Sequence, residues 1–303
     1  GSFEVTLAAL RAAWIRSSSM KASEVRSLLS IMVVLLAQGL GGQGRFDGHS
    51  RDVSQFSGQG ADVVGGIPHF EYTRDKGVSS VKYLMDLAEK YDVLVDVHCD
   101  ETDDPNSRFL EVLADEALVR GIGTRVTASH TTAMGSYDNA YCFKLFRLLK
   151  RSKINFISCP TESIHLQGRY DTYPKRRGIT RVPEIDRAGM NICFAQDSIR
   201  DPWYPVGNGN ILRILDAGLH ICHMLGYEDL QRCLDFISDN SAKTMALDEE
   251  YGIEVNRPAS FILFNVKDDY EVLTNQAKPI LSVKNGNKIM ETFEEKIEPT
   301  LFG

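Results

Sequence analysis

The sequence predicts an α/β protein built on a (β/α)8 TIM-type barrel. Short apolar runs end near positions 98, 130, 160 and 197, and amphipathic helical patterns separate them. A strand and a helix that repeat roughly every thirty residues are typical of a parallel sheet with right-handed crossovers. No glycine-rich phosphate loop follows these runs, which disfavours a nucleotide-binding doubly wound sheet and favours the barrel.

The predicted elements follow one another along the chain. Strand candidates are residues 31–37, 62–67, 93–99, 125–130, 154–159 and 191–197. Helical patterns cover residues 5–15, 79–91, 107–120 and 141–152, a short helix before residue 191, and about 211–225, 228–237 and 240–247. Residues 161–181 are polar and lack an apolar period, so we expect a loop there.

The pattern divides the chain into three parts. Residues 1–60 form an atypical N-terminal segment that begins with a tag-like Gly1-Ser2 and becomes rich in Gly, Ser, Gln and Asp. Residues 61–250 carry the regular strand and helix pattern of the barrel. Residues 251–303 contain apolar runs around Asn285-Gly286, a hairpin signal, and we expect a small β element packed on the barrel.

Composition excludes several function classes. The 303 residues carry a formal charge of −7 with a pI of about 5.6, which argues against a nucleic-acid-binding surface. The apolar run at residues 28–37 is about half the roughly twenty residues that a membrane helix needs. The six cysteines form no CxxC pair, which favours reduced thiols and a cytoplasmic location. We therefore expect a small-molecule substrate, with neither nucleic acid nor membrane as a partner.

Four side chains at strand ends form the candidate site. Chemistry in α/β sheets collects at the carboxyl ends of strands, where His98, His130 and Asp197 stand and Glu101 follows closely. His98 and Asp197 suit a divalent ion such as Fe2+ or Zn2+, and Glu101 suits a proton shuttle. His130 is a second metal ligand, a hydrogen-bond partner of the attacking water, or a structural residue; Asp197 is alternatively a helix N-cap.

Other residues give weaker signals. Trp203 is a candidate wall for a flat ring, or a plain core tryptophan. The loop around His165 carries several cations and is either a lid or a solvated face. His220 and His223 have helical i, i+3 spacing, for which packing is the more common explanation. His69 carries little signal.

Several longer segments carry a family resemblance. The segments are His98-Cys99-Asp100-Glu101, residues 128–134, residues 165–181 and residues 201–205. They resemble the bacterial cytosine deaminases of the amidohydrolase superfamily, and the likeness extends from about residue 61 to the C-terminus. The resemblance implies a (β/α)8 barrel with one divalent metal ion, Fe2+ or Zn2+. It implies hydrolytic deamination of a cyclic amidine such as cytosine by a metal-activated water, with release of ammonia.

The resemblance also implies a role for each site residue. His98 and Asp197 correspond to metal ligands, and Glu101 corresponds to the proton shuttle. His130 corresponds to the residue that polarises the hydrolytic water. Trp203 corresponds to a residue of the substrate pocket.

The chain departs from this family in three places. The family's His-x-His pair on the first barrel strand has no counterpart among the seven histidines. Residues 3–60 are too few for three strand-helix units, so we expect a barrel that lacks or remodels its first strands. Ser198 stands where the cytosine enzymes usually carry a second Asp, and residues 160–163 also differ. Ser198 is therefore a candidate substrate-binding residue that alters the pocket.

These departures leave alternatives open. Another cyclic amidine, such as creatinine or isoguanine, is an alternative substrate because a shorter neutral side chain at Ser198 changes the pocket. A catalytically inactive, truncated amidohydrolase that serves as an interaction protein is the alternative from another class, since two expected metal ligands are missing. Open sheet edges favour association, so a homo-oligomer is among the expected partners.

Overall fold

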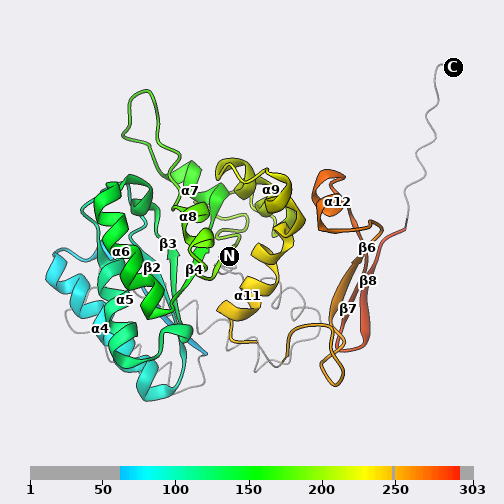
Figure 1. The fold of residues 1–303 in the computed structure, drawn as a ribbon, viewed down its shortest axis with the longest axis horizontal. Helices are drawn as coiled ribbons and strands as arrows, with labels where there is room; N and C mark the ends of the chain where they lie inside the picture. Colours follow the sequence, from blue (N-terminus) through cyan, green and yellow to red (C-terminus); the bar gives the residue numbers. More distant parts are fainter. Residues whose placement is uncertain (1–61, 248–249, 294–303) are drawn as a thin grey trace.

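A five-stranded parallel sheet organises the computed structural model, which describes residues 62–247 and 250–293 (Figure 1). The strands lie side by side in chain order, and each pairs in parallel with the next. They are β1 Val63–Gly66, β2 Leu94–Cys99, β3 Val126–His130, β4 Asn155–Ser158 and β5 Ile192–Phe194. This arrangement confirms the predicted α/β class, with the sequential strand order of a barrel wall. The predicted helix at 5–15 and strand at 31–37 lie outside the described residues.

Helices connect successive strands and cover one face of the sheet. They are α4 Arg74–Tyr91, α5 Phe109–Arg120, α6 Asn139–Ser152 and, before β5, the short α8 Val182–Arg187. Thr73 and Asp138 cap α4 and α6 by accepting hydrogen bonds from backbone N–H groups in their first turns. Within residues 62–247 and 250–293, no helix is long and apolar enough to cross a membrane.

The two faces of the sheet carry different residues. In β2, Val95, Val97 and Cys99 are buried in the large apolar core between the sheet and the helices. Side chains alternate along a strand, so Asp96 and His98 project from the opposite face, which we call the inner face. A separate apolar cluster of four residues lies on the inner side of β4 and β5. It consists of Ile157, Cys159, Cys193 and Ala195.

The segment after β4 differs from the prediction. The sequence predicts a loop over residues 161–181, whereas α7, Pro160–Leu166, occupies its start. The predicted strand at residues 154–159 ends just before Pro160, and proline is compatible with the end of a strand. Proline is also favoured in the first turn of a helix, where its missing N–H needs no partner. The prediction was therefore wrong for this first part of the loop.

Short helices follow β5. They are α9 Ile211–Ile221, α10 Tyr227–Gln231, the 3-10 helix η4 Cys233–Ile237, and α11 Asp239–Thr244. The predicted helix over residues 228–237 is therefore divided in two. The helix predicted to reach residue 225 ends earlier, because His223 adopts a left-handed backbone conformation with φ of 57°.

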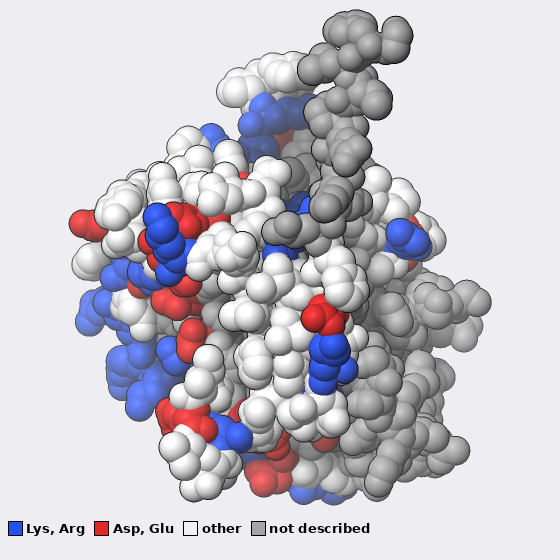
Figure 2. All heavy atoms as spheres, turned by 90° about the vertical axis from the view of Figure 1, so that its right-hand side faces the viewer, with Lys and Arg blue, Asp and Glu red and all other residues white. Residues whose placement is uncertain are grey.

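A three-stranded antiparallel sheet completes the described chain. It comprises β6 Phe261–Phe264, β7 Pro279–Lys284 and β8 Asn287–Glu291, with α12 Asp269–Thr274 between the first two strands. Asn285 and Gly286 form the predicted hairpin turn with φ of 48° and 76°. Figure 2 looks onto this side of the molecule, where most of the described surface is white, which marks residues other than Lys, Arg, Asp and Glu.

Candidate active site

Each of the five parallel strands brings a titratable side chain to its carboxyl end. His69 lies in the 3-10 helix η1, Pro68–Phe70, after β1; His98 and His130 lie in β2 and β3. Glu162 lies in the first turn of α7 after β4, and Asp197 follows β5. Because the strands are parallel and in chain order, these groups collect at one edge of the sheet.

His98 projects from the inner face near the end of β2. Its Nδ1 atom is buried and has no hydrogen-bond partner in the part of the chain that the structure describes. Its ring lies 4.6 Å from that of His130, measured between centroids. Burial, reinforced by the neighbouring His130, lowers the pKa of His98 to about 4. The ring is therefore neutral at pH 7, the state in which an imidazole nitrogen can bind a metal.

His130 reaches the site through an unusual backbone conformation. It is the register partner of Cys99, whose side chain belongs to the helix-covered core, so strand alternation alone would direct His130 away from the inner face. Left-handed φ values of 67° at His130 and 46° at Thr131 break that alternation. Thr131 is held by hydrogen bonds from its N–H to the Cys99 carbonyl and from its hydroxyl to the Thr180 hydroxyl, 3.0 and 2.8 Å long.

The turn that carries Glu101 is fixed by its neighbour Asp100. The buried Asp100 carboxylate accepts hydrogen bonds from the Ser107 hydroxyl at 2.6 Å and from the N–H groups of Phe109 and Leu110 at 3.0 and 2.8 Å. These two N–H groups begin α5, where backbone donors lack helical partners. The link ties the end of β2 to the following helix and holds Glu101 beside the sheet edge.

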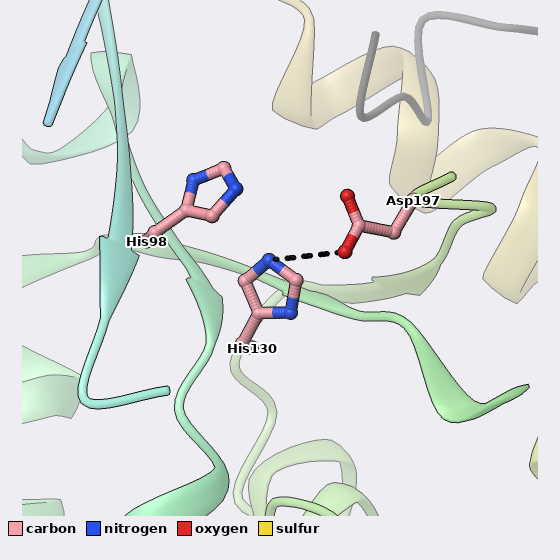
Figure 3. A group of neighbouring side chains, drawn as sticks. All are labelled: His98, His130 and Asp197. Carbon is pink, nitrogen blue, oxygen red and sulfur yellow. Dashed lines mark ion pairs between the residues drawn. The ribbon is translucent and has the colours of Figure 1, made fainter. Parts of the chain in front are cut away.

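The His130 imidazole lies between two carboxylates. Its Nδ1 is 3.4 Å from Glu101 Oε1, and its Nε2 is 3.9 Å from Asp197 Oδ2. Figure 3 shows the rings of His98 and His130 directed towards the Asp197 carboxylate. Burial, followed by the negative charges of Asp197 and Glu162, raises the pKa of Glu101 well above its usual range. A carboxyl group with a raised pKa beside an imidazole is suited to carrying protons.

Three of these side chains fit a divalent metal ion. His98, His130 and Asp197 each offer one donor atom, and these atoms lie within 4.8 Å of one another (Figure 3). Donors around a tetrahedral zinc ion lie about 3.4 Å apart, so small side-chain movements would close the site. Among the described residues, the buried Nδ1 of His98 and the two buried ring nitrogens of His130 have no hydrogen-bond partner, so an imidazole nitrogen of each is available as a donor. The structure thus brings together His98 and Asp197, the two predicted ligands.

Two residues of this site were missed by the sequence analysis. Glu162 is fully buried, and its Oε2 accepts a hydrogen bond from the Ser198 N–H at 3.3 Å. Burial, followed by the charge of Asp197, raises the pKa of Glu162 to about 8. A usable signal existed, because Glu162 follows the strand-end residue Cys159 by three positions, as Glu101 follows His98.

His69 is the second missed residue. Burial, followed by the neighbouring rings of His98 and His130, lowers the pKa of His69 to about 3. This electrostatic coupling places His69 beside the two strand-end histidines. The sequence offered only a lone histidine, which Pro68 separates from the end of the predicted strand at residues 62–67.

The remaining predicted residues lie around this group. Ser198 is buried and contacts Glu162 through its backbone. Trp203 lies on the turn after β5, is 44% exposed, and donates its backbone N–H to Asp201. Neither position decides whether these two residues bind substrate, which stays a prediction.

Two of the three remaining histidines in the described residues have local side-chain contacts. His165 lies near the end of α7 with its ring 6.2 Å from that of Tyr204, between centroids. The His220 ring contacts the Asp216 carbonyl within α9 at 2.8 Å, and His223 lies beyond the end of that helix. The i, i+3 pair therefore does not share one helix.

Comparison with known proteins gives a consistent picture. A model described as the amidohydrolase family matches residues 37–289. The crystal structure of 5-methylcytosine deaminase from Klebsiella pneumoniae liganded with 5-fluorocytosine is 67% identical, with a TM-score of 0.81, and the match covers 82% of this chain and 60% of that one. The structure of the same enzyme liganded with phosphonocytosine is 65% identical, with a TM-score of 0.82. That match covers 84% of this chain and 63% of the other.

A curated relative is more distant in sequence. N-isopropylammelide isopropyl amidohydrolase from Pseudomonas sp. (strain ADP) is 27% identical over 271 residues, which are 88% of this chain and 62% of the relative. The chain therefore spans about three fifths of the length of the proteins that it matches.

Proposed function

We propose a function from the premise that this chain belongs to the amidohydrolase family. The chain is a metal-dependent hydrolase that deaminates a cytosine-like cyclic amidine and releases ammonia. The observation that carries this proposal is the convergence of His98, His130 and Asp197 within 4.8 Å, with Glu101 3.4 Å from His130. This group combines metal donors with a proton carrier, the two components of metal-assisted hydrolysis of a C–N bond.

His98 and Asp197 would hold one Fe2+ or Zn2+ ion, and His130 is close enough to be a further donor. When bound, the ion would supply Lewis acidity and lower the pKa of a water molecule. The neutral imidazoles and the carboxylate suit either metal, and nothing in the donor set selects between them.

Glu101 and His130 would handle the protons of the reaction. Glu101 takes a proton from the attacking water and delivers it to the departing amino group, so that a C–O bond forms, the C–N bond breaks and ammonia leaves. His130, held between Glu101 and Asp197, orients the water by hydrogen bonding if it is not itself a ligand. The burial of Glu101 supports this role, because a raised pKa favours the protonated carboxyl that delivers a proton to the leaving group.

The substrate is a cytosine-like ring. The two structures that are 67% and 65% identical are of an enzyme named for 5-methylcytosine and hold 5-fluorocytosine and phosphonocytosine. Ser198, next to Asp197, and Trp203 would contact the ring. Creatinine and isoguanine are the alternative substrates to include in a screen, because pocket residues alone distinguish such amidines.

A second candidate function is that of an inactive interaction protein. It is favoured by the sequence itself, in which the seven histidines include no His-x-His pair. A homo-oligomer and a cytoplasmic location stay predictions from the sequence.

Elemental analysis combined with an ammonia-release screen tests the proposal. We expect about one transition-metal ion per chain and ammonia release from cytosine or 5-methylcytosine. Isoguanine and creatinine provide the comparison substrates. Purified chain that retains no metal after loading and turns over none of these compounds would support the inactive protein instead.

A further inference from the structure

We propose that Glu162 is an additional substrate-binding residue, whose free oxygen accepts a hydrogen bond from the ring N–H of the bound pyrimidine. The inference rests on the proposed deaminase function and names a specificity-determining contact within that site. Three structural observations support it: the burial of Glu162, the unequal use of its two oxygens, and the groups that surround it.

The two carboxylate oxygens of Glu162 have different environments. Oε2 accepts the Ser198 N–H at 3.3 Å, which fixes the orientation of the carboxyl group. Oε1 is buried and has no hydrogen-bond partner within the described part of the chain. A buried acceptor that is left unpaired destabilises the fold, so such atoms in native proteins usually have a partner in a bound molecule or water.

The surroundings of Glu162 point to the reaction site. Its charge interacts with those of Asp197 and Glu101, so the carboxyl group borders the proposed metal site and proton shuttle. Three carboxyl groups in one buried region repel one another when they are ionised. A hydrogen-bond donor from the substrate would offset that repulsion, whereas a carbonyl oxygen of the substrate would add to it.

Cytosine has two kinds of N–H donor. The exocyclic amino group leaves during deamination and belongs beside Glu101, the proposed proton carrier. The ring N1–H is not changed by the reaction, and it is the donor that Glu162 would recognise. The assignment makes 1-methylcytosine, in which a methyl group replaces that hydrogen, the matched probe.

Glu162 has an alternative role as a positioning residue. Its hydrogen bond with Ser198 supports the backbone next to Asp197, so a purely structural role would also make its substitution harmful. The two roles differ in ligand dependence. A lost positioning contact weakens all ligands alike, whereas a lost substrate contact weakens only the ligands that carry the N1–H donor.

The test measures binding by titration calorimetry with the zinc-loaded full chain carrying Glu101→Gln, which should bind these ligands without deaminating them. The ligands are cytosine, 5-fluorocytosine and 1-methylcytosine, and the variants are Glu162→Gln and the control Glu116→Gln. Glutamine has one acceptor oxygen and cannot serve both Ser198 and the ring N–H. Glu116 is a partly buried carboxylate on α5 that pairs with Arg120, away from the sheet edge.

We expect Glu162→Gln to weaken cytosine and 5-fluorocytosine about 10- to 100-fold, as loss of a buried hydrogen bond that leaves its N–H donor unpaired does. The affinity for 1-methylcytosine should change less than about threefold, and Glu116→Gln should bind all three ligands normally. Equal losses for all ligands, or no loss, would overturn the substrate contact while leaving the deaminase proposal intact.

The same Glu101→Gln chain with Glu162 intact gives an independent result that does not depend on the folding of a Glu162 variant. It should prefer cytosine to 1-methylcytosine at least tenfold. Equal affinity for both compounds would overturn the Glu162 assignment. Failure to bind either compound or 5-fluorocytosine would overturn the proposed function itself.

Discussion

The two faces of the five-stranded sheet carry different kinds of side chain. The face under the helices is a continuous apolar core that includes Val95, Val97 and Phe156. The inner face carries Asp96 and His98, and its separate apolar cluster has only four members. Strand β2 contributes to both faces, as β4 and β5 also do, because successive side chains of a strand point to opposite faces.

The difference separates what stabilises the fold from what performs the chemistry. Burial of apolar area in the outer core favours folding, whereas burial of His98, Glu101 and Glu162 opposes their ionisation and adds no comparable stability. Substitutions on the inner face should therefore lower metal binding or activity, whereas substitutions on the helix-covered face should lower the free energy of unfolding. The four predictions below test that separation.

The largest effect is expected from loss of a metal donor. His98→Ala should reduce bound metal from about one ion per chain to a small fraction and abolish ammonia release, since too few donors remain. Metal content by elemental analysis and ammonia by a coupled assay check this. His220→Ala, on the exposed surface of α9, is the control and should keep both. Normal metal content in the His98→Ala variant would show that His98 is not a metal ligand.

Removal of the proton carrier should lower the rate without removing the metal. Glu101→Gln keeps the size of the side chain but cannot shuttle a proton, so kcat should fall about 10²- to 10⁴-fold. Metal content and the midpoint of thermal unfolding should stay near those of the unmodified chain. Activity within a few-fold of normal would assign the shuttle to another group of the site.

On the helix-covered face, the effect should be on stability. Phe156 is fully buried in β4, and Phe156→Ala should lower the free energy of unfolding by about 3–5 kcal/mol through lost contacts and a cavity. Urea unfolding measures the change. The folded variant should retain its metal ion. Loss of metal in a variant that still unfolds cooperatively would show that the two faces are coupled.

The smallest effect concerns the pH dependence of stability. Burial raises the pKa of Asp96 from 3.8 to about 6, against the opposing hydrogen bond from Ser129. The folded state thus prefers the protonated carboxyl. The contribution of Asp96 to stability is fully present below about pH 4 and is lost as the pH rises through about 6, by roughly 1–3 kcal/mol.

Asp96→Asn should remove that loss. Urea unfolding of chelator-treated protein at pH 4 and pH 7 compares the variant with the unmodified chain. Asp92→Asn is the control, because the Asp92 side chain is 91% exposed. An Asp96→Asn variant with the same pH dependence as the unmodified chain would contradict the assignment.

The sequence predicted the strands better than the segments between them. Apolar runs such as residues 93–99 identify buried strands directly, and the residues that end them include His98 and His130. Parallel strands in chain order then bring these ends together, so convergence of His98, His130 and Asp197 was predictable. Helix α7 was missed because Pro160 is compatible with both the end of a strand and the start of a helix.

Residues beyond the strand ends were harder to predict. Glu162 and His69 enter the site through short helical turns, whose direction depends on packing that a single sequence does not show. The orientation of His130 was equally hidden, because regular alternation places it on the wrong face. Sequence patterns therefore identified the strands that carry the chemistry, but not every group that surrounds it.

The left-handed turn at His130 and Thr131 matters to anyone who would graft this site onto another scaffold. Copying the histidines and carboxylates onto regular strands would leave one imidazole facing the helices. The graft must include Thr131 with its Thr180 hydrogen bond, although neither residue is one of the three metal-donor candidates. The smallest transferable unit is therefore a set of side chains together with a bend in the main chain. Thr131 and Thr180, which hold that bend, are 49 positions apart in the sequence.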